Sequence, residues 1–301
     1  MNIIETKNLT RRFGRTEAVH GLDLVVPTGS VFALLGSNGA GKTTTIKMLM
    51  NLLTPTAGAA QVFGVDSRQL GERERAQIGY VSENQQLPLW MTLRQLLDYC
   101  RPFYPTWDRA LEQTLLARFD LPEARKLAQL SRGMLMKAAL LSSLAYRPKL
   151  LVLDEPFSGL DPLVRDEFIK GVLEVSAQGD WTVLVSSHDI DEVERLADQV
   201  AMLEDGRLRF SESTETLQAR FRRVEVTGAA SSFSPGADWL DWEQAGALTR
   251  FVETRYTGEV TERAWRERFG SDRVTAQPMT LREIFLTLAR AGRITAKEAS
   301  A

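Results

Sequence analysis

What this sequence lacks excludes several classes of protein. Cys100 is the one cysteine among 301 residues, so the chain can form no internal disulfide and no multi-cysteine zinc site, as is typical of a reducing compartment. No apolar run approaches the roughly 20 residues of a membrane-spanning helix, and the first residues, MNIIETKNLTRRFG, hold no apolar core of signal-peptide length. Basic residues number 37 and acidic residues 39, which argues against a generally basic nucleic-acid binder.

The composition and patterning that remain are typical of an α/β protein. Hydrophobic residues make up 44% of the chain, which is enough for a sizeable core. Strand-like apolar runs recur as SVFALLG, KLLVLDE and TVLVSS, with helical patterns between them. This alternation predicts an α/β domain with a parallel sheet. From about residue 83 to 147 the pattern is helical, so we predict a helical subdomain inserted into the α/β core.

The composition changes after Phe210, where a polar and charged segment begins. Beyond it, ALTRFVETRY is strand-like, whereas TERAWRERF and MTLREIFLTLARAG are helical in pattern. Thr280 and Glu283 have the spacing of a capping box that starts the last of these helices. We therefore predict a first domain over residues 1–220 and a small α+β accessory domain over residues 221–301.

The strongest chemical signal is the run GSNGAGKT, which matches the phosphate-binding pattern GxxxxGK[ST] between a buried strand and a helix. Small residues let backbone N–H groups wrap phosphate oxygens, and the helix start adds its positive dipole end. Lys42 can then reach the β- and γ-phosphates, and Thr43 offers a hydroxyl to Mg²⁺. The residues expected to bind the nucleotide here are Gly36, Ser37, Asn38, Gly39, Ala40, Gly41, Lys42, Thr43 and Thr44.

A carboxylate pair ends the run LLVLDEP. The apolar residues predict a buried strand that delivers Asp154 and Glu155 to the edge of the sheet where ligands bind. Asp154 would hold Mg²⁺, and Glu155 would orient and polarise the attacking water as general base. Together with the phosphate loop, this pair predicts a nucleotide hydrolase.

Three further segments narrow the kind of hydrolase. LSRGM lies about twenty residues before the carboxylate pair, SGLD follows the pair and ends at Asp161, and His188 ends the strand-like run TVLVSSH. In this order of motifs the chain resembles, over about residues 3–215, the ATP-binding subunits of ABC transporters. The resemblance implies the fold of those ATPases, with ATP as ligand and Mg²⁺ as cofactor.

The resemblance also implies a site shared between two subunits. In such ATPases two cassettes dimerise head to tail with two nucleotides between them. Ser131 and Gly133 would then touch the γ-phosphate bound by Lys42 of the other subunit, with the start of a helix directed at the negative charge. Asp161 would lie at the dimer seam. His188 would contact the γ-phosphate and help to hold the attacking water.

At two positions the chain departs from the family pattern. Arg132 replaces a small residue of the signature segment, and its charge would face either a phosphate or solvent. Glu83, after IGYVS, aligns with the place where the family usually has glutamine. A carboxylate there can bind Mg²⁺ or a water, but it adds negative charge near the γ-phosphate. We expect Glu83 to be a ligand on the magnesium side.

Some aromatic and basic residues leave two interpretations open. Phe13 occupies the place where the family stacks a ring on adenine, although a phenylalanine can equally serve packing. The aromatic residues of segment 90–107 either pack the helical subdomain or form a groove for a short helix of a membrane partner. The basic run at residues 220–223 belongs either to a solvated linker or to a surface that meets anionic lipid.

The resemblance implies a subunit that hydrolyses ATP and powers transport by a separate integral-membrane permease, with overall likeness favouring export. The expected partners are that permease and a second ATP-binding cassette, identical or related, and no nucleic acid. The expected location is peripheral, on the cytoplasmic face of the inner membrane. The alternative is a soluble ABC-type ATPase that acts on ribosomes or DNA. Relatives with those roles usually carry two cassettes, long coiled coils or zinc motifs, which this sequence does not show.

Overall fold

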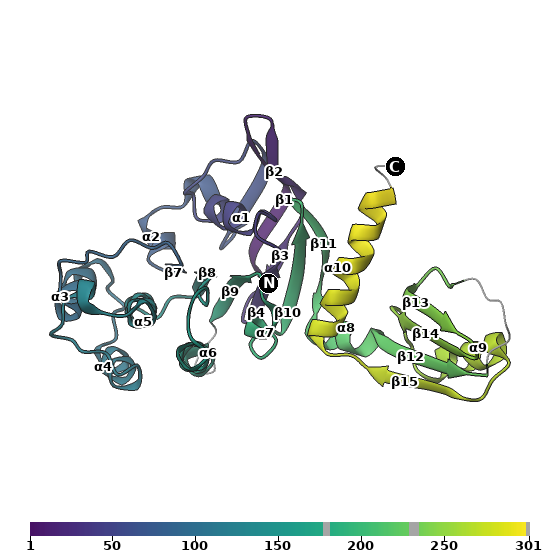
Figure 1. Ribbon diagram of the computed structural model, residues 1–301. Coiled ribbons are helices and arrows are strands. Elements are labelled where there is room, and N and C mark those ends of the chain that lie inside the picture. The colour runs from purple at the N-terminus through teal and green to yellow at the C-terminus, as the bar shows by residue number, and fades with distance from the viewer. Residues whose placement is uncertain (177–180, 229–234, 299–301) are drawn as a thin grey trace. The chain divides into compact units, whose positions relative to one another are not determined.

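The apolar run before the phosphate loop forms a central strand of a sheet in the computed structural model, which describes residues 1–176, 181–228 and 235–298 (Figure 1). Pairing is parallel from β10 through to β7. The carboxyl ends of these strands therefore lie along one edge. In spatial order the strands are β11 (Arg207–Ser213), β10 (Gln199–Glu204), β4 (Val31–Leu35), β9 (Thr182–Ser187), β8 (Leu150–Asp154) and β7 (Ile78–Ser82).

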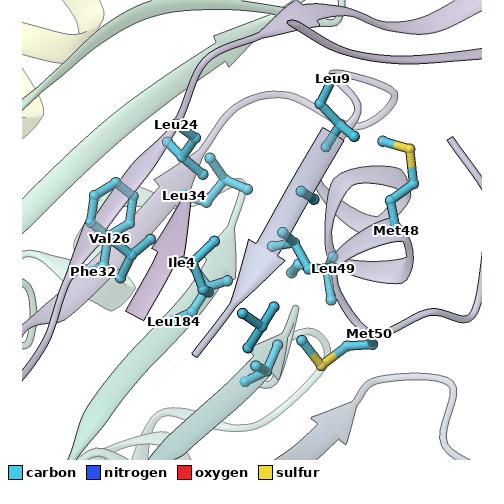
Figure 2. Packing of buried hydrophobic residues seen from close by; sticks show 14 of the residues in the cluster. Ile4, Leu9, Leu24, Val26, Phe32, Leu34, Met48, Leu49, Met50 and Leu184 are labelled. Atoms are coloured by element: carbon cyan, nitrogen blue, oxygen red, sulfur yellow. The ribbon is translucent and has the colours of Figure 1, made fainter. Parts of the chain in front are cut away.

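A second, antiparallel sheet supplies the other side of the core. Its pairing is built on β1, which contacts β2, β3 and β5. Side chains from this sheet, from β4 and from the helix α1 (Lys42–Leu49) pack together, as Ile4, Phe32 and Leu49 do in Figure 2. The strands are β1 (Asn2–Phe13), β2 (Thr16–Leu22), β3 (Val25–Pro27), β5 (Ala57–Val62) and β6 (Val65–Asp66).

The chain between β7 and β8 is mainly helical. Each α-helix there starts at a side chain that accepts a hydrogen bond from the first turn, since Thr92, Asp108 and Ser131 are the N-caps. The elements are α3 (Leu93–Cys100), a 3₁₀ turn (Arg101–Phe103), α4 (Arg109–Arg118), a second 3₁₀ turn (Leu127–Gln129) and α5 (Arg132–Leu144).

A buried carboxylate ties these helices together. Glu112 on α4 is 1% exposed and accepts from the indole Nε1 of Trp107 at 2.7 Å and from Arg101 at 3.0 Å. Tyr104 stacks on Tyr146 with ring centroids 3.8 Å apart. This part of the aromatic segment therefore packs the end of α5 against the helices before it.

The other helices of the first unit flank the sheets. They are a 3₁₀ turn (Ser67–Gln69), α2 (Glu72–Arg75), α6 (Pro162–Ser176) and α7 (Ile190–Val193). Among the helices in the described ranges, none combines the length and apolar composition needed to cross a bilayer.

The chain divides into two compact units, Met1–Ser211 and Glu212–Ala301. In the second unit, Leu217 is fully buried and Arg220 donates to the carbonyl of Thr254 at 2.7 Å, so helix α8 (Thr214–Arg220) joins this unit. The division therefore differs from the expected boundary at residue 220 by that helix.

The second unit is α+β, and its antiparallel sheet has the order β13-β14-β12-β15. Its core is aromatic, with Trp239 stacked on Phe251 at 4.1 Å between centroids. The expected capping box is present, since the N–H of Thr280 donates to Glu283 at 2.9 Å. The elements are β12 (Arg222–Thr227), β13 (Trp239–Ala245), β14 (Leu248–Glu253), α9 (Glu259–Phe269), β15 (Val274–Pro278) and α10 (Leu281–Glu298).

Candidate active site

The glycine-rich loop connects the end of β4 to the start of α1 and shapes a pocket. At Gly41 the backbone has φ +100°, and a Cβ there would lie 2.5 Å from the carbonyl oxygen of Ala18, so only glycine fits. The pocket has a volume of about 320 Å³, and the first residues of α1 line it, so the N-terminal end of the helix faces the pocket. Its lining residues are Asn38, Gly39, Ala40, Gly41, Lys42, Thr43, Thr44, Glu83 and Glu155.

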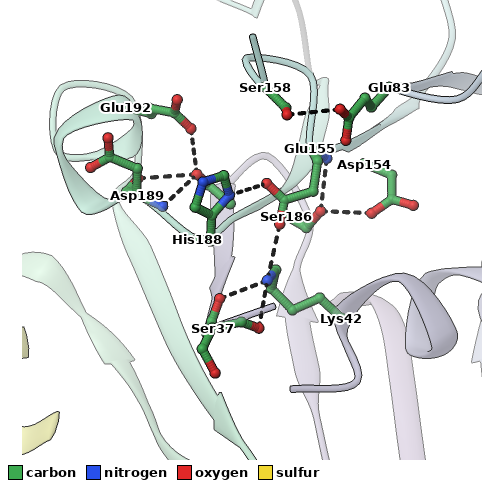
Figure 3. A network of polar contacts seen from close by, with 12 residues as sticks. Ser37, Lys42, Glu83, Asp154, Glu155, Ser158, Ser186, His188, Asp189 and Glu192 are labelled. Carbon is green, nitrogen blue, oxygen red and sulfur yellow. Dashed lines mark hydrogen bonds and ion pairs between the residues drawn. The ribbon is translucent and has the colours of Figure 1, made fainter. Parts of the chain in front are cut away.

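Lys42 lines this pocket and is 5% exposed. Figure 3 shows its polar contacts. Its Nζ donates to the carbonyl oxygens of Gly36 at 2.6 Å and Ser37 at 3.1 Å. It also forms an ion pair with Oε1 of Glu155 at 2.9 Å. The charge of the ammonium group is therefore compensated by the Glu155 carboxylate. A bound phosphate would supply the same compensating charge.

Glu155 has a left-handed backbone, with φ +51°. A non-glycine residue in this conformation is strained, and the surrounding hydrogen bonds hold it there. Its N–H donates to Oγ of Ser186 at 3.0 Å, and its Oε2 lies 2.8 Å from Nδ1 of His188. The carboxylate is thus held between Lys42 and His188, with one oxygen toward each (Figure 3).

Asp154, one residue earlier, is 4% exposed. Its Oδ1 accepts from the hydroxyls of Thr43 at 3.0 Å and Ser186 at 2.8 Å. Burial raises the pKa of this carboxyl, and the two hydroxyl groups oppose that rise by stabilising the ionised form.

The Thr43 hydroxyl and the Asp154 carboxylate are the hard oxygen donors that Mg²⁺ prefers. In the part of the chain that the structure describes, no cluster of three acidic, histidine or cysteine side chains could hold a metal by itself. The donor set therefore fits a metal that takes its remaining ligands from phosphate and water.

Glu83 follows β7 and reaches the same edge of the sheet. Its N–H donates to the carbonyl of Asp154 at 3.0 Å, because β7 and β8 pair in register. Its Oε1 accepts from Oγ of Ser158 at 2.8 Å and from Nη2 of Arg132 at 2.6 Å. Arg132 is half-exposed to solvent, and its guanidinium also pairs with Glu83, a contact that the sequence alone did not indicate.

Comparisons with known proteins identify the fold that carries this site. The family model described as ABC transporter matches residues 19–158. The daunorubicin/doxorubicin resistance ATP-binding protein DrrA of Streptomyces peucetius is 36% identical over 72% of this chain and 67% of its own length. The chain belongs to the ATP-binding subunits of ABC transporters. The bacitracin transport ATP-binding protein BcrA of Enterococcus faecalis is 31% identical over 73% of this chain and 72% of its own.

A solved structure described as the ATP-binding subunit of an ABC transporter has a TM-score of 0.65 at 30% identity, over 72% of this chain and 92% of that one. The predicted ABC-type fold, ATP binding and ATPase activity are thereby confirmed, because this family hydrolyses ATP to drive transport. Such subunits dimerise and work with membrane components. The comparisons lend no support to the alternative of a ribosome- or DNA-acting ATPase.

Other expected site residues of this ABC subunit lie outside the phosphate pocket. Ser131 is exposed and caps α5 through the N–H of Met134 at 3.2 Å. Gly133 lies against α6, where a Cβ would be 2.8 Å from Val164. Asp161 is also exposed and accepts from the N–H of Val164 at 3.0 Å, which caps α6. One chain therefore does not bring these residues to its own phosphate loop.

Phe13 ends β1, and the residue is 47% exposed. The guanidinium of Arg11 lies 4.6 Å from the centre of this ring. The ring is therefore available on the surface rather than packed in the core.

Sequence reasoning missed Ser186. Its hydroxyl donates to Asp154 and accepts from the N–H of Glu155, so it fixes both carboxylate residues. The available signal was a hydroxyl residue directly after the apolar run VLV, two positions before His188.

Changing Ser186 to alanine removes the group that holds both carboxylates. We expect kcat for ATP hydrolysis to fall roughly 100-fold because Glu155 loses the partner of its strained backbone. Steady-state hydrolysis measures kcat, and thermal unfolding verifies that the variant is folded. Ser142→Ala is the matched control, since that hydroxyl donates to the carbonyl of Ala139 within α5. Equal turnover in the two variants would contradict the role assigned to Ser186.

Proposed function

We propose that this chain is the ATPase of a bacterial exporter and that it works as a head-to-tail dimer on a separate membrane permease. The observation that carries the proposal is the division of the chemistry within one chain. Lys42, Asp154, Glu155 and His188 meet at the phosphate pocket, whereas Ser131 stands exposed at the start of another helix.

Nucleotide binding begins with an exchange of partners at Lys42. The triphosphate brings negative charge to the N-terminal end of α1, where backbone N–H groups and the helix dipole favour it. Lys42 then pairs with the phosphates in place of Glu155. Thr43 and Asp154 are the residues that would hold Mg²⁺, with Glu83 on the same side, and the metal supplies charge neutralisation at the phosphate oxygens.

Once Lys42 has left it, Glu155 is free to accept a proton from the attacking water as general base. His188 lies 2.8 Å from its carboxylate, so His188 can orient Glu155 and contact the γ-phosphate. The strained backbone of Glu155 keeps the carboxylate directed at the pocket. Phe13 is the residue that we assign to stacking on adenine.

The second half of the site comes from the partner subunit. Ser131 offers a hydroxyl and the start of the 13-residue helix α5 to the γ-phosphate bound by the other chain. Gly133 keeps that surface flat, and Asp161 lies beside it at the proposed seam. ATP closes the dimer, hydrolysis removes the γ-phosphate, and product release reopens it.

The permease contact is proposed for the exposed part of the aromatic segment. Trp90, Tyr99 and Phe103 are 70%, 59% and 63% exposed, in contrast to Tyr104 and Trp107, which pack internally. Beside Leu89 lies a small pocket of about 90 Å³, which α5 helps to line. Exposed aromatic side chains are typical of a protein interface, and a pocket with apolar lining is typical of a place that receives a partner side chain. The cell location that follows is the cytoplasmic face of the membrane.

Export is proposed from the relatives. The names of DrrA and BcrA describe drug resistance and bacitracin transport. The transported molecule itself contacts the permease, so its identity does not follow from the residues of this chain.

Replacing Glu155 with glutamine tests the shared site. The variant should accumulate as an ATP-bound, two-chain species, because loss of the general base slows hydrolysis by about 10²–10⁴-fold. Adding Ser131→Ala should return it to a single chain. Size-exclusion chromatography with light scattering, in ATP and Mg²⁺, measures the outcome.

Ser213→Ala is the matched control, because Ser213 caps α8 as Ser131 caps α5 and loss of a cap costs about 1 kcal/mol. The Glu155→Gln, Ser213→Ala variant should remain a dimer. Two results together would contradict the shared site. They are a Glu155→Gln, Ser131→Ala variant that remains a dimer and a Ser131→Ala single variant that hydrolyses ATP at the wild-type rate. Triphosphate binding by one chain would then be all that the proposal retains.

Trp90→Ala tests the permease contact. In the native host the variant should move from the membrane fraction to the supernatant, since loss of a central aromatic costs an interface about 2 kcal/mol, or roughly 30-fold in affinity. Hydrolysis by the purified variant should stay within about twofold of wild type. Val25→Ala, on an exposed apolar residue of β3, is the control that should stay with the membrane. Equal fractionation of both variants would contradict the assignment.

A further inference from the structure

Glu83 and Arg132 form an ion pair at the rim of the phosphate pocket. Nη2 of Arg132 lies 2.6 Å from Oε1 of Glu83, and the same oxygen accepts from Ser158 at 2.8 Å (Figure 3 shows the serine contact). The side chains are 52% and 31% exposed. Among the described residues, no hydrogen bond or ion pair engages Oε2 of Glu83. One carboxylate oxygen is therefore anchored and the other is available.

The position of Glu83 creates an electrostatic problem for nucleotide binding. Its side chain lines the phosphate pocket together with Glu155, and Asp154 lies next to both. A polyphosphate entering this pocket meets the carboxylates of Glu83 and Glu155, and Lys42 is the cation among the described residues that line it. Like charges a few ångströms apart repel unless a counter-charge is present.

The guanidinium of Arg132 occupies a space that Gly159 leaves open. Gly159 has φ +67°, and a Cβ there would lie 2.7 Å from Nη1 of Arg132. A larger residue would therefore occupy the space that the guanidinium fills. Arg132 lines the small pocket beside Glu83, whereas the phosphate pocket is lined by other residues. The arginine thus faces the carboxylate and not the phosphate position of its own chain.

We propose that Arg132 is a positioning residue for nucleotide binding: it neutralises Glu83 and fixes Oε1, so that the carboxylate can stay beside the phosphates without repelling them. The inference rests on the proposed function, because it assumes that ATP occupies this pocket. Arg132 directly follows Ser131 in the chain. The ion pair therefore links the carboxylate at one nucleotide with the serine offered to the other.

The test is a double-mutant cycle on nucleotide affinity, with AMP-PNP and Mg²⁺ and titration calorimetry. Arg132→Ala should weaken binding roughly tenfold, the effect of one uncompensated charge near a phosphate at a partly screened site. Glu83→Gln keeps the size of the side chain and one oxygen, and its affinity is the reference for the cycle, because the lost carboxylate also lies on the magnesium side of the pocket. The double variant should bind within about threefold of Glu83→Gln, because Arg132 then has no charge to neutralise, which is a strongly non-additive result.

Two further variants serve as references. Arg132→Lys keeps the charge and should bind more tightly than Arg132→Ala. Arg209→Ala is the matched control, since Arg209 also pairs with a glutamate at 2.6 Å, is 46% exposed and lies on β11 outside the pocket. It should bind like wild type. Thermal unfolding of each variant verifies that it is folded.

Three other results of these binding measurements would each contradict one part of the proposal. A double variant about tenfold weaker than Glu83→Gln would show that Arg132 acts on the phosphate directly and not through Glu83. Affinities within twofold of wild type for all variants would show that the pair does not position anything. Failure of the wild-type chain to bind AMP-PNP would contradict the proposed function itself and not the ion pair.

Discussion

The buried ion pair between Lys42 and Glu155 is the contact on which the rest of the site depends. An ammonium group that is 5% exposed must have a counter-charge, and here the proposed general base provides it. In the proposed mechanism, the same contact keeps Glu155 from acting on water. A triphosphate can replace the carboxylate as the partner of Lys42. Its binding then releases Glu155, the proposed base, in the same exchange. Binding and activation are coupled because a single lysine serves both anions.

The sheet makes this exchange possible by bringing distant residues to one edge. β4, β7, β8 and β9 are parallel and paired in register, so the loop, Glu83, the carboxylate pair and His188 all follow strand ends that lie side by side. Helices between the strands carry Ser131 and Asp161 to exposed positions instead. In the proposed dimer, phosphate binding is thus internal to one chain, whereas the serine contact requires a second one. The second unit adds a separate aromatic core and no described residue of the phosphate pocket.

Local patterns predicted a large part of this arrangement. The phosphate loop, the buried strand before the carboxylate pair and the caps at Ser131 and Thr280 depend on residues close in sequence, and all are present as elements of the fold. The partner of Arg132 could not be read in this way, because Glu83 lies 49 residues away and meets it through tertiary packing. Ser186 was missed for a similar reason, since its bonds depend on the register of β8 and β9. In the aromatic segment, Tyr104 and Trp107 are packed internally whereas Trp90, Tyr99 and Phe103 are exposed. Composition alone could not distinguish the packed residues from the exposed ones.

The central claim is that nucleotide displaces Glu155 from Lys42. A structure of the wild-type chain with AMP-PNP and Mg²⁺ measures this directly. It should place Nζ of Lys42 about 2.8 Å from a phosphate oxygen, with the Glu155 carboxylate no longer paired to it. A structure with bound nucleotide in which the Lys42–Glu155 ion pair persists would contradict the account.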